Sequence, residues 1–269
     1  MLIDGRNIAR DIRAALRGEH AQFLRTPVLG VLMGEGDRVV DQFVRIKERT
    51  AHDIGVTLVR QWLSSSSTTE DALDGLARLC KCSDGVIVQL PLPASIESSL
   101  VVEAIPAEKD IDGIGKTPRV FPPVIEAMKE ILKLNRIGIA GKDALIVGRG
   151  RLVGGPAAKW LASEGAHTTI LAKDEKGLVS AARRADIIVL GAGAPGLLTP
   201  DMVKKGSVIL DAGTSEEGGE VRGDADPRCA EEALIFTPVP GGIGPIAVSM
   251  IFKNLFLLMQ KENPSESRG

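Results

Sequence analysis

A glycine-rich loop in the second half of the chain is the segment whose spacing most directly indicates chemistry. The apolar run Ala144–Val147 leads into Gly148-Arg-Gly-Arg-Leu-Val-Gly154-Gly-Pro156, one residue longer than the usual dinucleotide fingerprint. Glycines permit a tight turn that brings backbone N–H groups and a helix N-terminus to a pyrophosphate. The alternative is a glycine-rich turn without a ligand. The predicted cofactor-binding residues of this loop are Gly148, Arg149, Gly150, Val153 and Gly154.

Residues after the following strand bear on which dinucleotide would bind. An acidic residue there would hold the adenosine ribose of NAD, whereas a basic residue would favour the 2′-phosphate of NADP. Both Lys173 and Asp174 are present, so the residues do not choose between NAD and NADP. A solvated turn that binds no ligand is also left open. A later small-residue loop would let a ring or sugar approach the backbone, unless it is only a tight turn. Its predicted contacts are Gly191, Ala192 and Gly193.

Polar residues in the first half of the chain form a second group of candidates. Lys47 lies four residues after Phe43 in a helical pattern, so the two share a face. Gln89 ends a buried strand, where its amide must be hydrogen-bonded if it is buried. Asp110 and Asp112 follow a turn. Taken singly, each has a plain alternative: a solvated lysine, a satisfied amide and a loop that ends a helix.

The elements around these positions alternate between short apolar runs and helical patterns. In the first half, we expect strands at Pro27–Met33, Val56–Trp62 and Gly85–Gln89 and helices at Asp41–Ile54 and Asp71–Leu79, with Thr68 or Thr69 as a helix cap. Strands joined by crossover helices are typical of a parallel sheet. Residues that follow each strand then lie at the carboxyl edge, where open α/β proteins bind ligands.

The second half repeats this alternation. Expected strands are Asp143–Gly148, Thr168–Ala172, Ile187–Leu190, Val208–Asp211 and Leu234–Thr237, and expected helices are Val124–Leu134, Gly155–Glu164 and Ile246–Lys261. We therefore predict an α/β protein of two lobes, each with a mostly parallel sheet and crossover helices, the second being Rossmann-like. The predicted domains are residues 1–118 and 119–245, with the last helix, about 246–262, packing back on the first lobe.

Composition argues against several classes of protein. The net charge of −2 is unlike the basic excess of a nucleic-acid binder, and no apolar run approaches the roughly 18 residues of a membrane span. The charged start lacks a signal core, so we expect a cytoplasmic protein with no nucleic-acid or membrane partner. Cys80 and Cys82 have no second pair, which predicts neither a zinc site nor a disulfide. The chain has no tyrosine, so no mechanism here can use a phenol.

Four segments, in order, resemble one enzyme family. They are Val88-Gln-Leu-Pro-Leu-Pro93, Pro106-Ala-Glu-Lys-Asp-Ile-Asp-Gly113, the glycine loop, and Thr237-Pro-Val-Pro-Gly-Gly-Ile-Gly-Pro245. The chain is similar in these to the methylenetetrahydrofolate dehydrogenase/methenyltetrahydrofolate cyclohydrolase family, and the resemblance spans nearly the whole chain. It implies oxidation of 5,10-methylenetetrahydrofolate with NADP (NAD remaining possible), followed by hydrolysis to 10-formyltetrahydrofolate in one-carbon metabolism. It also implies tetrahydrofolate derivatives as partners and a homodimer.

The same resemblance implies roles for the first group of candidates. Lys47, with a pKa lowered near a cationic substrate, would accept a proton from the attacking water, and Gln89 would hydrogen-bond that lysine. Asp112 would read the amino and ring N–H edge of the pterin. The implied substrate-binding residues are Phe43, Val88, Leu90, Pro91, Pro240, Gly241 and Gly242.

Some positions depart from the family pattern. The family's active-site tyrosine falls at Phe43, which lacks the hydroxyl, and family serines or threonines fall at Val40, Gly150, Lys173 and Ala247. These departures leave two alternatives: a dehydrogenase with weak or no cyclohydrolase activity, or a non-catalytic protein that binds a dinucleotide or folate.

Overall fold

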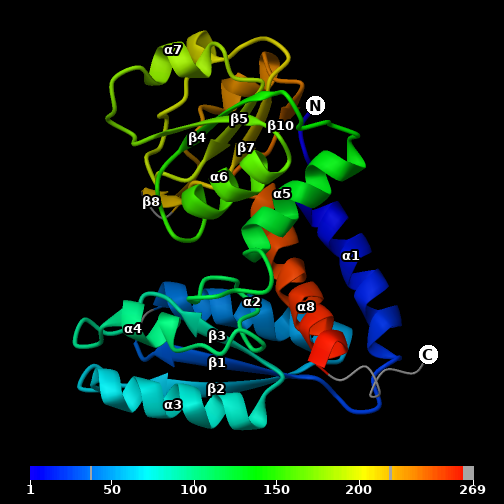
Figure 1. Cartoon of the computed structure of the whole chain (residues 1–269), viewed down its shortest axis with the longest axis vertical. Coiled ribbons are helices and arrows are strands. Elements are labelled where there is room, and N and C mark those ends of the chain that lie inside the picture. Colours follow the sequence, from blue (N-terminus) through cyan, green and yellow to red (C-terminus); the bar gives the residue numbers. More distant parts are fainter. Residues whose placement is uncertain (37, 218–219, 263–269) are drawn as a thin grey trace. The chain divides into compact units, whose positions relative to one another are not determined.

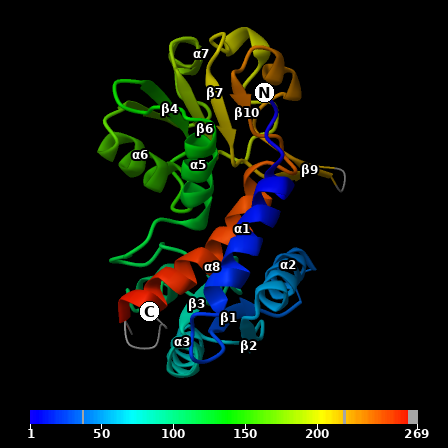
Figure 2. The ribbon, with the colours of Figure 1, turned by 90° about the vertical axis from the view of Figure 1, so that its right-hand side faces the viewer.

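The computed structural model describes residues 1–36, 38–217 and 220–262, which form two compact units (Figures 1 and 2). The lysine unit contains Arg10–Pro123 and the chain from Val248, and the glycine-loop unit contains Met1–Ala9 and Val124–Ala247. Helices α1 (Gly5–His20) and α8 (Ile243–Glu262) each carry the chain from one unit into the other. The domain limits read from the sequence, at residues 118 and 245, stay a prediction.

The lysine unit is built on a parallel sheet of three strands in the order β2-β1-β3. The strands are β1 (Val28–Gly34), β2 (Thr57–Leu63) and β3 (Gly85–Gln89), and they are connected by α2 (Arg38–Ile54) and α3 (Thr69–Cys82). Alternate residues of β1 enter different cores, as the two-residue period of a strand requires. Val31 and Met33 pack with residues of α2 and α8, whereas Leu32 packs with residues of α3.

Local chemistry explains where α3 begins. The Thr68 side chain accepts a hydrogen bond from the Asp71 backbone N–H, and the Asp71 carboxylate accepts one from the Thr68 backbone N–H. This reciprocal capping box satisfies two N–H groups that the helix itself cannot pair. The expected cap at Thr68 is thereby confirmed. A short helix, α4 (Ser98–Glu103), follows β3 and packs on α3.

The glycine-loop unit contains a parallel sheet of five strands in the order β10-β7-β6-β4-β5. The strands are β4 (Asp143–Val147), β5 (His167–Leu171), β6 (Ile187–Leu190), β7 (Val208–Asp211) and β10 (Ile235–Phe236). The helical segments are α5 (Pro123–Leu134), α6 (Gly154–Ser163), α7 (Leu178–Ala182) and the 3-10 turns η1 (Pro200–Met202) and η2 (Pro227–Glu231). The central strands β4, β6 and β7 are buried apart from Asp143 at the start of β4, as in a sheet covered on both faces. This confirms the expected α/β class with parallel sheets.

The first residues of the chain extend this sheet at β10. Leu2 pairs with Phe236 in parallel, and the Ile3 N–H donates to the Phe236 carbonyl. An antiparallel hairpin of β8 (Ser215–Glu217) and β9 (Glu220–Arg222) follows β7. Neither this hairpin nor α1 was among the elements expected from the sequence.

Helix α8 is long and apolar enough, at a mean hydropathy of 1.5, to cross a membrane by length and composition alone. Two thirds of that stretch is buried within the protein, which is typical of a core helix. Phe252, Leu255 and Phe256 lie in the same core cluster as Val31 and Met33 of β1. The apolar character of α8 is thus explained by packing.

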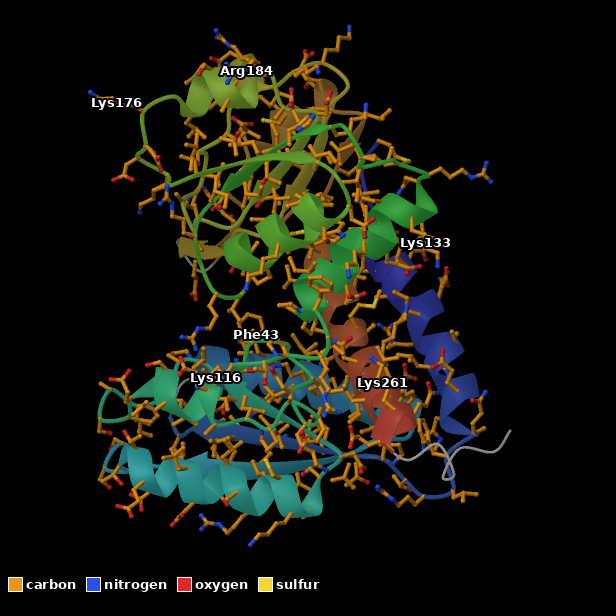
Figure 3. The ribbon with its side chains drawn as sticks, in the orientation of Figure 1. Phe43, Lys116, Lys133, Lys176, Arg184 and Lys261 are labelled. Carbon is orange, nitrogen blue, oxygen red and sulfur yellow. The ribbon has the colours of Figure 1, made fainter. Side chains whose placement is uncertain are left out.

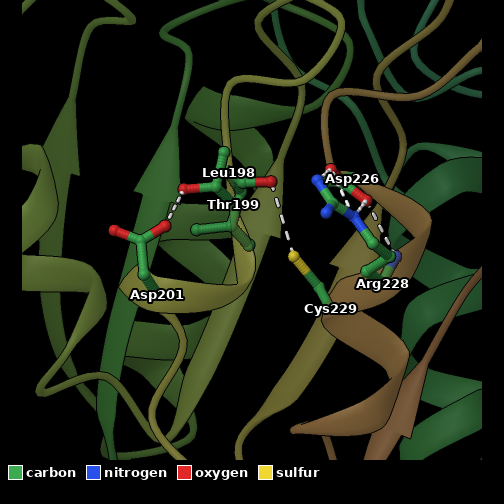
Figure 4. Close-up of polar contacts among 6 residues, drawn as sticks. All are labelled: Leu198, Thr199, Asp201, Asp226, Arg228 and Cys229. Atoms are coloured by element: carbon green, nitrogen blue, oxygen red, sulfur yellow. Dashed lines mark hydrogen bonds and ion pairs between the residues drawn. The ribbon is translucent and has the colours of Figure 1, made fainter.

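A buried thiol of η2 contacts the chain just before η1, and the other contacts drawn in Figure 4 join residues two positions apart. The Cys229 Sγ donates to the Leu198 carbonyl at 3.4 Å, and burial raises the pKa of this thiol to about 12. Asp226 accepts from the Arg228 backbone and guanidinium, which lowers the pKa of its carboxyl to about 2. Cys229 is therefore a structural residue that stays protonated at neutral pH.

Candidate active site

Lys47 and Gln89 come together at one end of the lysine unit's sheet. Lys47 lies on α2, and Gln89 is the last residue of β3. The Lys47 Nζ donates to the Gln89 Oε1 at 2.5 Å, and the Gln89 Nε2 donates to the Leu90 carbonyl at 3.0 Å. Because the second bond uses the amide nitrogen, the amide oxygen is left to face the lysine.

Burial changes the charge state that this lysine prefers. Desolvation lowers the pKa of Lys47, and the nearby Asp112 carboxylate opposes that change. The same effects act on Asp112, because burial raises the pKa of its carboxyl to about 6 while Lys47 lowers it and Asp110 raises it. Taking two charges out of water costs more than their attraction returns unless the geometry is favourable. A lysine in this setting gives up its proton more readily than one in water, so it can act as a base.

Two buried side chains hold the loop that carries Asp112. Asp110, fully buried, accepts hydrogen bonds from the backbone N–H groups of Gly115 at 2.7 Å and Ile114 at 3.4 Å. Asn254 of α8 donates through its Nδ2 to the carbonyls of Ile111 at 2.9 Å and Phe121 at 3.0 Å. Asp112 is thus flanked by residues whose backbone is fixed. The sequence signal for Asn254 was an amide between apolar residues in the middle of a largely apolar helix.

The turn after Asp112 needs its glycine. Gly113 has a φ of +62°, and a Cβ added there would lie 2.6 Å from the Val120 carbonyl oxygen. A side chain would therefore be strained both by the backbone conformation and by the neighbouring chain.

The expected substrate-binding residues of this unit differ in exposure. Phe43 projects from α2 one turn before Lys47, with 48% of its surface exposed (Figure 3). Leu90 is half-buried and Pro91 is exposed. Val88 is only 2% exposed and packs in the core with Leu32 and Leu76, so a ligand could reach its backbone but not its side chain.

The glycine loop of the other unit is closely packed at its ends and open in its middle. Gly148 has a φ of +108°, and a Cβ on it would lie 2.5 Å from the Gly191 carbonyl oxygen; one on Gly154 would lie 2.0 Å from the Gly148 oxygen. Val153 packs against Gly191, where an added Cβ would meet it at 2.7 Å. By contrast, a Cβ on Gly150 would have no neighbour within 4 Å.

This open middle lies at the N-terminus of α6. A surface pocket there is lined by Arg149, Gly155 and Ile170, and α6 begins at Gly154 with no side-chain cap. A guanidinium beside the positive end of a helix suits a phosphate-bearing ligand, although the Gly155 N–H already donates to the Gly150 carbonyl. The residues present therefore fit the dinucleotide that the glycine spacing predicts.

An ion pair joins the glycine loop to the turn after β5. The Arg149 guanidinium donates to the Glu175 carboxylate at 2.9 Å, and the same oxygen accepts from the Ala172 backbone N–H at 2.8 Å. Lys173 and Asp174, the residues named from the sequence, are exposed. The acidic residue that contacts the glycine loop is Glu175. The contact forms because β4 and β5 are neighbouring strands, which brings the residues after them close together.

The small-residue loop after β6 is held by a buried carboxylate. Asp224 accepts hydrogen bonds from the N–H groups of Ala192 (2.7 Å), Gly193 (3.2 Å) and Ala194 (2.6 Å). Asp211, at the end of β7, accepts from Gly213 and Ala225, and burial raises the pKa of its carboxyl to about 7, with Asp224 adding to the rise. The N–H groups of Ala192, Gly193 and Ala194 already donate to Asp224 and are not available to a ligand. The loop would therefore contact a ligand through van der Waals packing.

The remaining expected residues, Pro240, Gly241 and Gly242, lie in the glycine-loop unit before α8. The Gly5 N–H donates to the Gly241 carbonyl at 2.9 Å, and the Gly242 N–H to the Pro238 carbonyl at 2.7 Å. Gly242 is buried, Pro240 is exposed, and Gly241 has a φ of +107°. Within the described residues there is no group of three or more His, Cys, Asp or Glu side chains suited to a metal ion.

Comparisons with known proteins agree with the motifs. The catalytic domain of tetrahydrofolate dehydrogenase/cyclohydrolase matches residues 3–112, and the NAD(P)-binding domain of the same enzymes matches residues 122–263. A bifunctional protein FolD from Staphylococcus aureus (strain Newman) is 37% identical, over 95% of both chains.

Solved structures show the same fold. The bifunctional enzyme FolD from Campylobacter jejuni superposes with a TM-score of 0.93 at 28% identity, covering 97% of this chain and 99% of that one. The FolD enzyme from Trypanosoma brucei, crystallised with NADP and an inhibitor, gives a TM-score of 0.91 at 29% identity, covering 98% of each chain. The chain belongs to the tetrahydrofolate dehydrogenase/cyclohydrolase family.

Proposed function

We propose that the protein oxidises 5,10-methylenetetrahydrofolate to the methenyl form with NADP and hydrolyses that product to 10-formyltetrahydrofolate. The observation that carries the proposal is the hydrogen bond from Lys47 to Gln89 beside Asp112. Relatives matched along nearly the whole chain are bifunctional FolD proteins, and one is described with bound NADP.

Lys47 is the proposed general base of the hydrolytic step. Water adds to the methenyl carbon, and the neutral Lys47 amine accepts the proton that this water loses. The bond from that carbon to one ring nitrogen then breaks, the nitrogen gains a proton, and a formyl group remains on the other nitrogen. Burial favours the neutral amine, and Gln89 fixes its direction.

Asp112 is the proposed anchor for the pterin. An ionised carboxylate can accept two hydrogen bonds from an amino group and a neighbouring ring N–H, and such charge-assisted bonds are among the stronger ones in proteins. The pKa of about 6 leaves Asp112 ionised at neutral pH. The exposed ring of Phe43, one turn from Lys47, would cover the flat pterin.

The dinucleotide is proposed to bind through the glycine loop, with Arg149 and the N-terminus of α6 at its phosphates. When bound, its nicotinamide ring accepts the hydride that leaves the one-carbon bridge. Gly150 leaves room for the ligand, and the Asp224-held loop at Gly191–Gly193 gives it a fixed wall.

A dehydrogenase with weak cyclohydrolase activity is the second candidate. Phe43 supports it, because the side chain one turn from Lys47 has no hydroxyl to bind the lysine or the attacking water. A positioned group of that kind is worth roughly ten- to a hundredfold in rate.

Purified protein mixed with 5,10-methylenetetrahydrofolate and either NADP or NAD separates these candidates. Reduced cofactor and methenyl product are followed by absorbance as separate signals. Reduced cofactor without methenyl accumulation is the result expected of the bifunctional enzyme, and accumulated methenyl product identifies the dehydrogenase alone. Nucleotide binding without turnover would contradict both.

The homodimer and a cytoplasmic role in one-carbon metabolism are part of the proposal. β5 is an edge strand of its sheet and exposes Ile170. Such an edge offers unpaired backbone groups to another chain. Light scattering on the purified protein tests it, with the mass of two chains as the expected result.

A further inference from the structure

The Glu175 carboxylate lies where the glycine loop meets the end of β5. β4 and β5 are neighbouring parallel strands, with Val147 opposite Leu171, so the residues after them emerge at the same edge of the sheet. Arg149 follows β4 by two positions, and Glu175 follows β5 by four. Glu175 Oε2 accepts from both the Arg149 guanidinium (2.9 Å) and the Ala172 N–H (2.8 Å), so one bond joins the carboxylate to the glycine loop and the other fixes it to its own turn.

This edge of a Rossmann-like unit is where the adenosine ribose of a dinucleotide is read. A carboxylate there accepts a hydrogen bond from a free 2′-hydroxyl, and an arginine there accommodates a 2′-phosphate. In this protein the two residue types are joined to each other. A 2′-phosphate that approaches Arg149 meets a guanidinium whose charge is compensated, beside a carboxylate of the same sign as the phosphate.

We propose that Glu175 is a specificity-determining residue that lowers the preference of this site for a 2′-phosphorylated dinucleotide by engaging Arg149. This proposal rests on the proposed function only in taking a nicotinamide dinucleotide as the ligand of the glycine loop. Glu175 acts through charge and through Arg149, and it leaves the binding of a nucleotide with a free 2′-hydroxyl intact.

The exposure of the pair decides how large the effect is. The Arg149 and Glu175 side chains are 62% and 40% exposed, so their mutual attraction contributes little to the stability of the fold. A phosphate beside the same carboxylate would carry nearly two negative charges at a separation of a few ångströms. In water this repulsion corresponds to about a tenfold loss of affinity, which salt screens.

The test compares Glu175→Gln with the wild-type protein. Glutamine keeps the length of the side chain and can still accept from the Ala172 N–H, but it has no charge. Isothermal titration with 2′,5′-ADP and with 5′-AMP isolates the 2′-phosphate, and titration with NADP and NAD follows. We expect Glu175→Gln to bind 2′,5′-ADP and NADP about tenfold more tightly at low salt, with 5′-AMP and NAD changed less than twofold.

Two further variants show how the effect arises. Glu164→Gln removes the same charge just beyond the far end of the ten-residue α6, about 15 Å along the helix, and is expected to leave the ratio of affinities unchanged. In an Arg149→Gln background, adding Glu175→Gln still removes the direct repulsion of the phosphate, so any larger gain in the wild-type background measures the part of the effect that acts through Arg149. Equal changes for phosphorylated and unphosphorylated nucleotides, or no change, would overturn the proposal.

The outcome is independent of catalysis. A wild-type protein that binds nucleotides but oxidises no methylenetetrahydrofolate would contradict the proposed function, and the 2′,5′-ADP to 5′-AMP ratio would still report on Glu175. Conversely, an active enzyme whose ratio is insensitive to Glu175→Gln would keep its function and lose this proposal.

Discussion

The chemistry proposed for the lysine unit depends on the proton of one side chain. Replacing Lys47 with Met keeps a long, flexible chain but removes the amine, so the attacking water has no base. We expect the cyclohydrolase rate to fall by about two to four orders of magnitude, with NADP affinity unchanged, because the nucleotide site lies on other residues. Quenched assays of 10-formyltetrahydrofolate formation measure the rate. Lys81→Met, at an exposed position near the end of α3, is the matched control, and an unaltered rate in Lys47→Met would remove Lys47 from the mechanism.

Phe43 supplies the opposite kind of test, because a group is added. Phe43→Tyr places a hydroxyl one helical turn from Lys47 on a side chain already 48% exposed, so the new oxygen need not be buried. If the missing hydroxyl limits hydrolysis, the cyclohydrolase rate is expected to rise about tenfold or more. Dehydrogenase turnover, measured alongside, should change much less. No gain would mean that water or another side chain already fills this role.

Asp112 predicts how folate binding responds to pH. Its carboxyl has a pKa of about 6, raised mainly by burial, and the ionised form binds the pterin edge. Affinity for tetrahydrofolate is therefore expected to be full above pH 7 and to decrease as the pH falls through 6. Asp112→Asn should bind about tenfold more weakly at pH 7.5 and approach the wild-type affinity near pH 5. Binding titrations at the two pH values measure this, and a parallel loss at both would assign Asp112 to folding instead.

At the scale of elements, α8 positions the loop that carries Asp112. Asn254→Ala leaves the buried carbonyls of Ile111 and Phe121 without their donor, at a cost of about 1–3 kcal/mol. A positioning role predicts that KM for folate rises while the dinucleotide affinity stays the same. It also predicts that the pH midpoint of folate binding moves from about 6 toward that of an ordinary carboxyl, which a general loss of stability would not do.

Asn135→Ala is the matched control for this change. The Asn135 side chain also donates to a backbone carbonyl, that of Ile131 at 2.7 Å after α5, in the glycine-loop unit. We expect it to alter thermal stability without moving the pH midpoint of folate binding. If both variants move that midpoint equally, Asn254 has no specific relation to Asp112.

The elements that the sequence predicted well are those with strong local patterns. Buried strands such as β1 and β6 are continuous apolar runs between polar turns, and α3 carries its own cap, so their limits differ from expectation by few residues. The hairpin β8-β9 has short polar strands and no alternation, which left it unrecognised. α1 is amphipathic, but charged residues dominate its sequence and obscure its apolar positions.

The residues of the candidate site also divide into those that the sequence predicted and those that it did not. The motifs gave Gln89, Asp112 and the glycine loop as candidates, because these residues lie in contiguous and unusual strings, whereas Lys47 came from the resemblance to the family. They did not identify Asn254 or Glu175, because each acts through a partner far along the chain: Asn254 through Ile111, 143 residues away, and Glu175 through Arg149, 26 residues away. Which of several polar residues near a strand end makes the contact depends on the packing of neighbouring elements.

For the molecule as a whole, the buried carboxylates of the glycine-loop unit predict how stability depends on pH. The Asp211 carboxyl has a folded-state pKa of about 7, above its ordinary value of 3.8, because burial disfavours its charge and Asp224 lies near. Between pH 4 and 7 the unfolded chain loses this proton while the folded protein keeps it. Asp211 therefore lowers stability progressively as the pH rises through that range, and above pH 7 the loss is complete.

Asp211→Asn removes this titration at the cost of one weakened acceptor for the Gly213 and Ala225 N–H groups. We expect the difference in Tm between this variant and the wild type to become more positive from pH 5.5 to pH 8, whatever its value at pH 5.5. Asp226→Asn is the control, because the pKa of Asp226 is lowered to about 2 and both its folded and unfolded forms are ionised throughout that range. Its Tm difference should stay constant. If the Asp211→Asn difference is also constant, Asp211 is ionised in the folded protein and contributes nothing to the pH dependence of stability over this range.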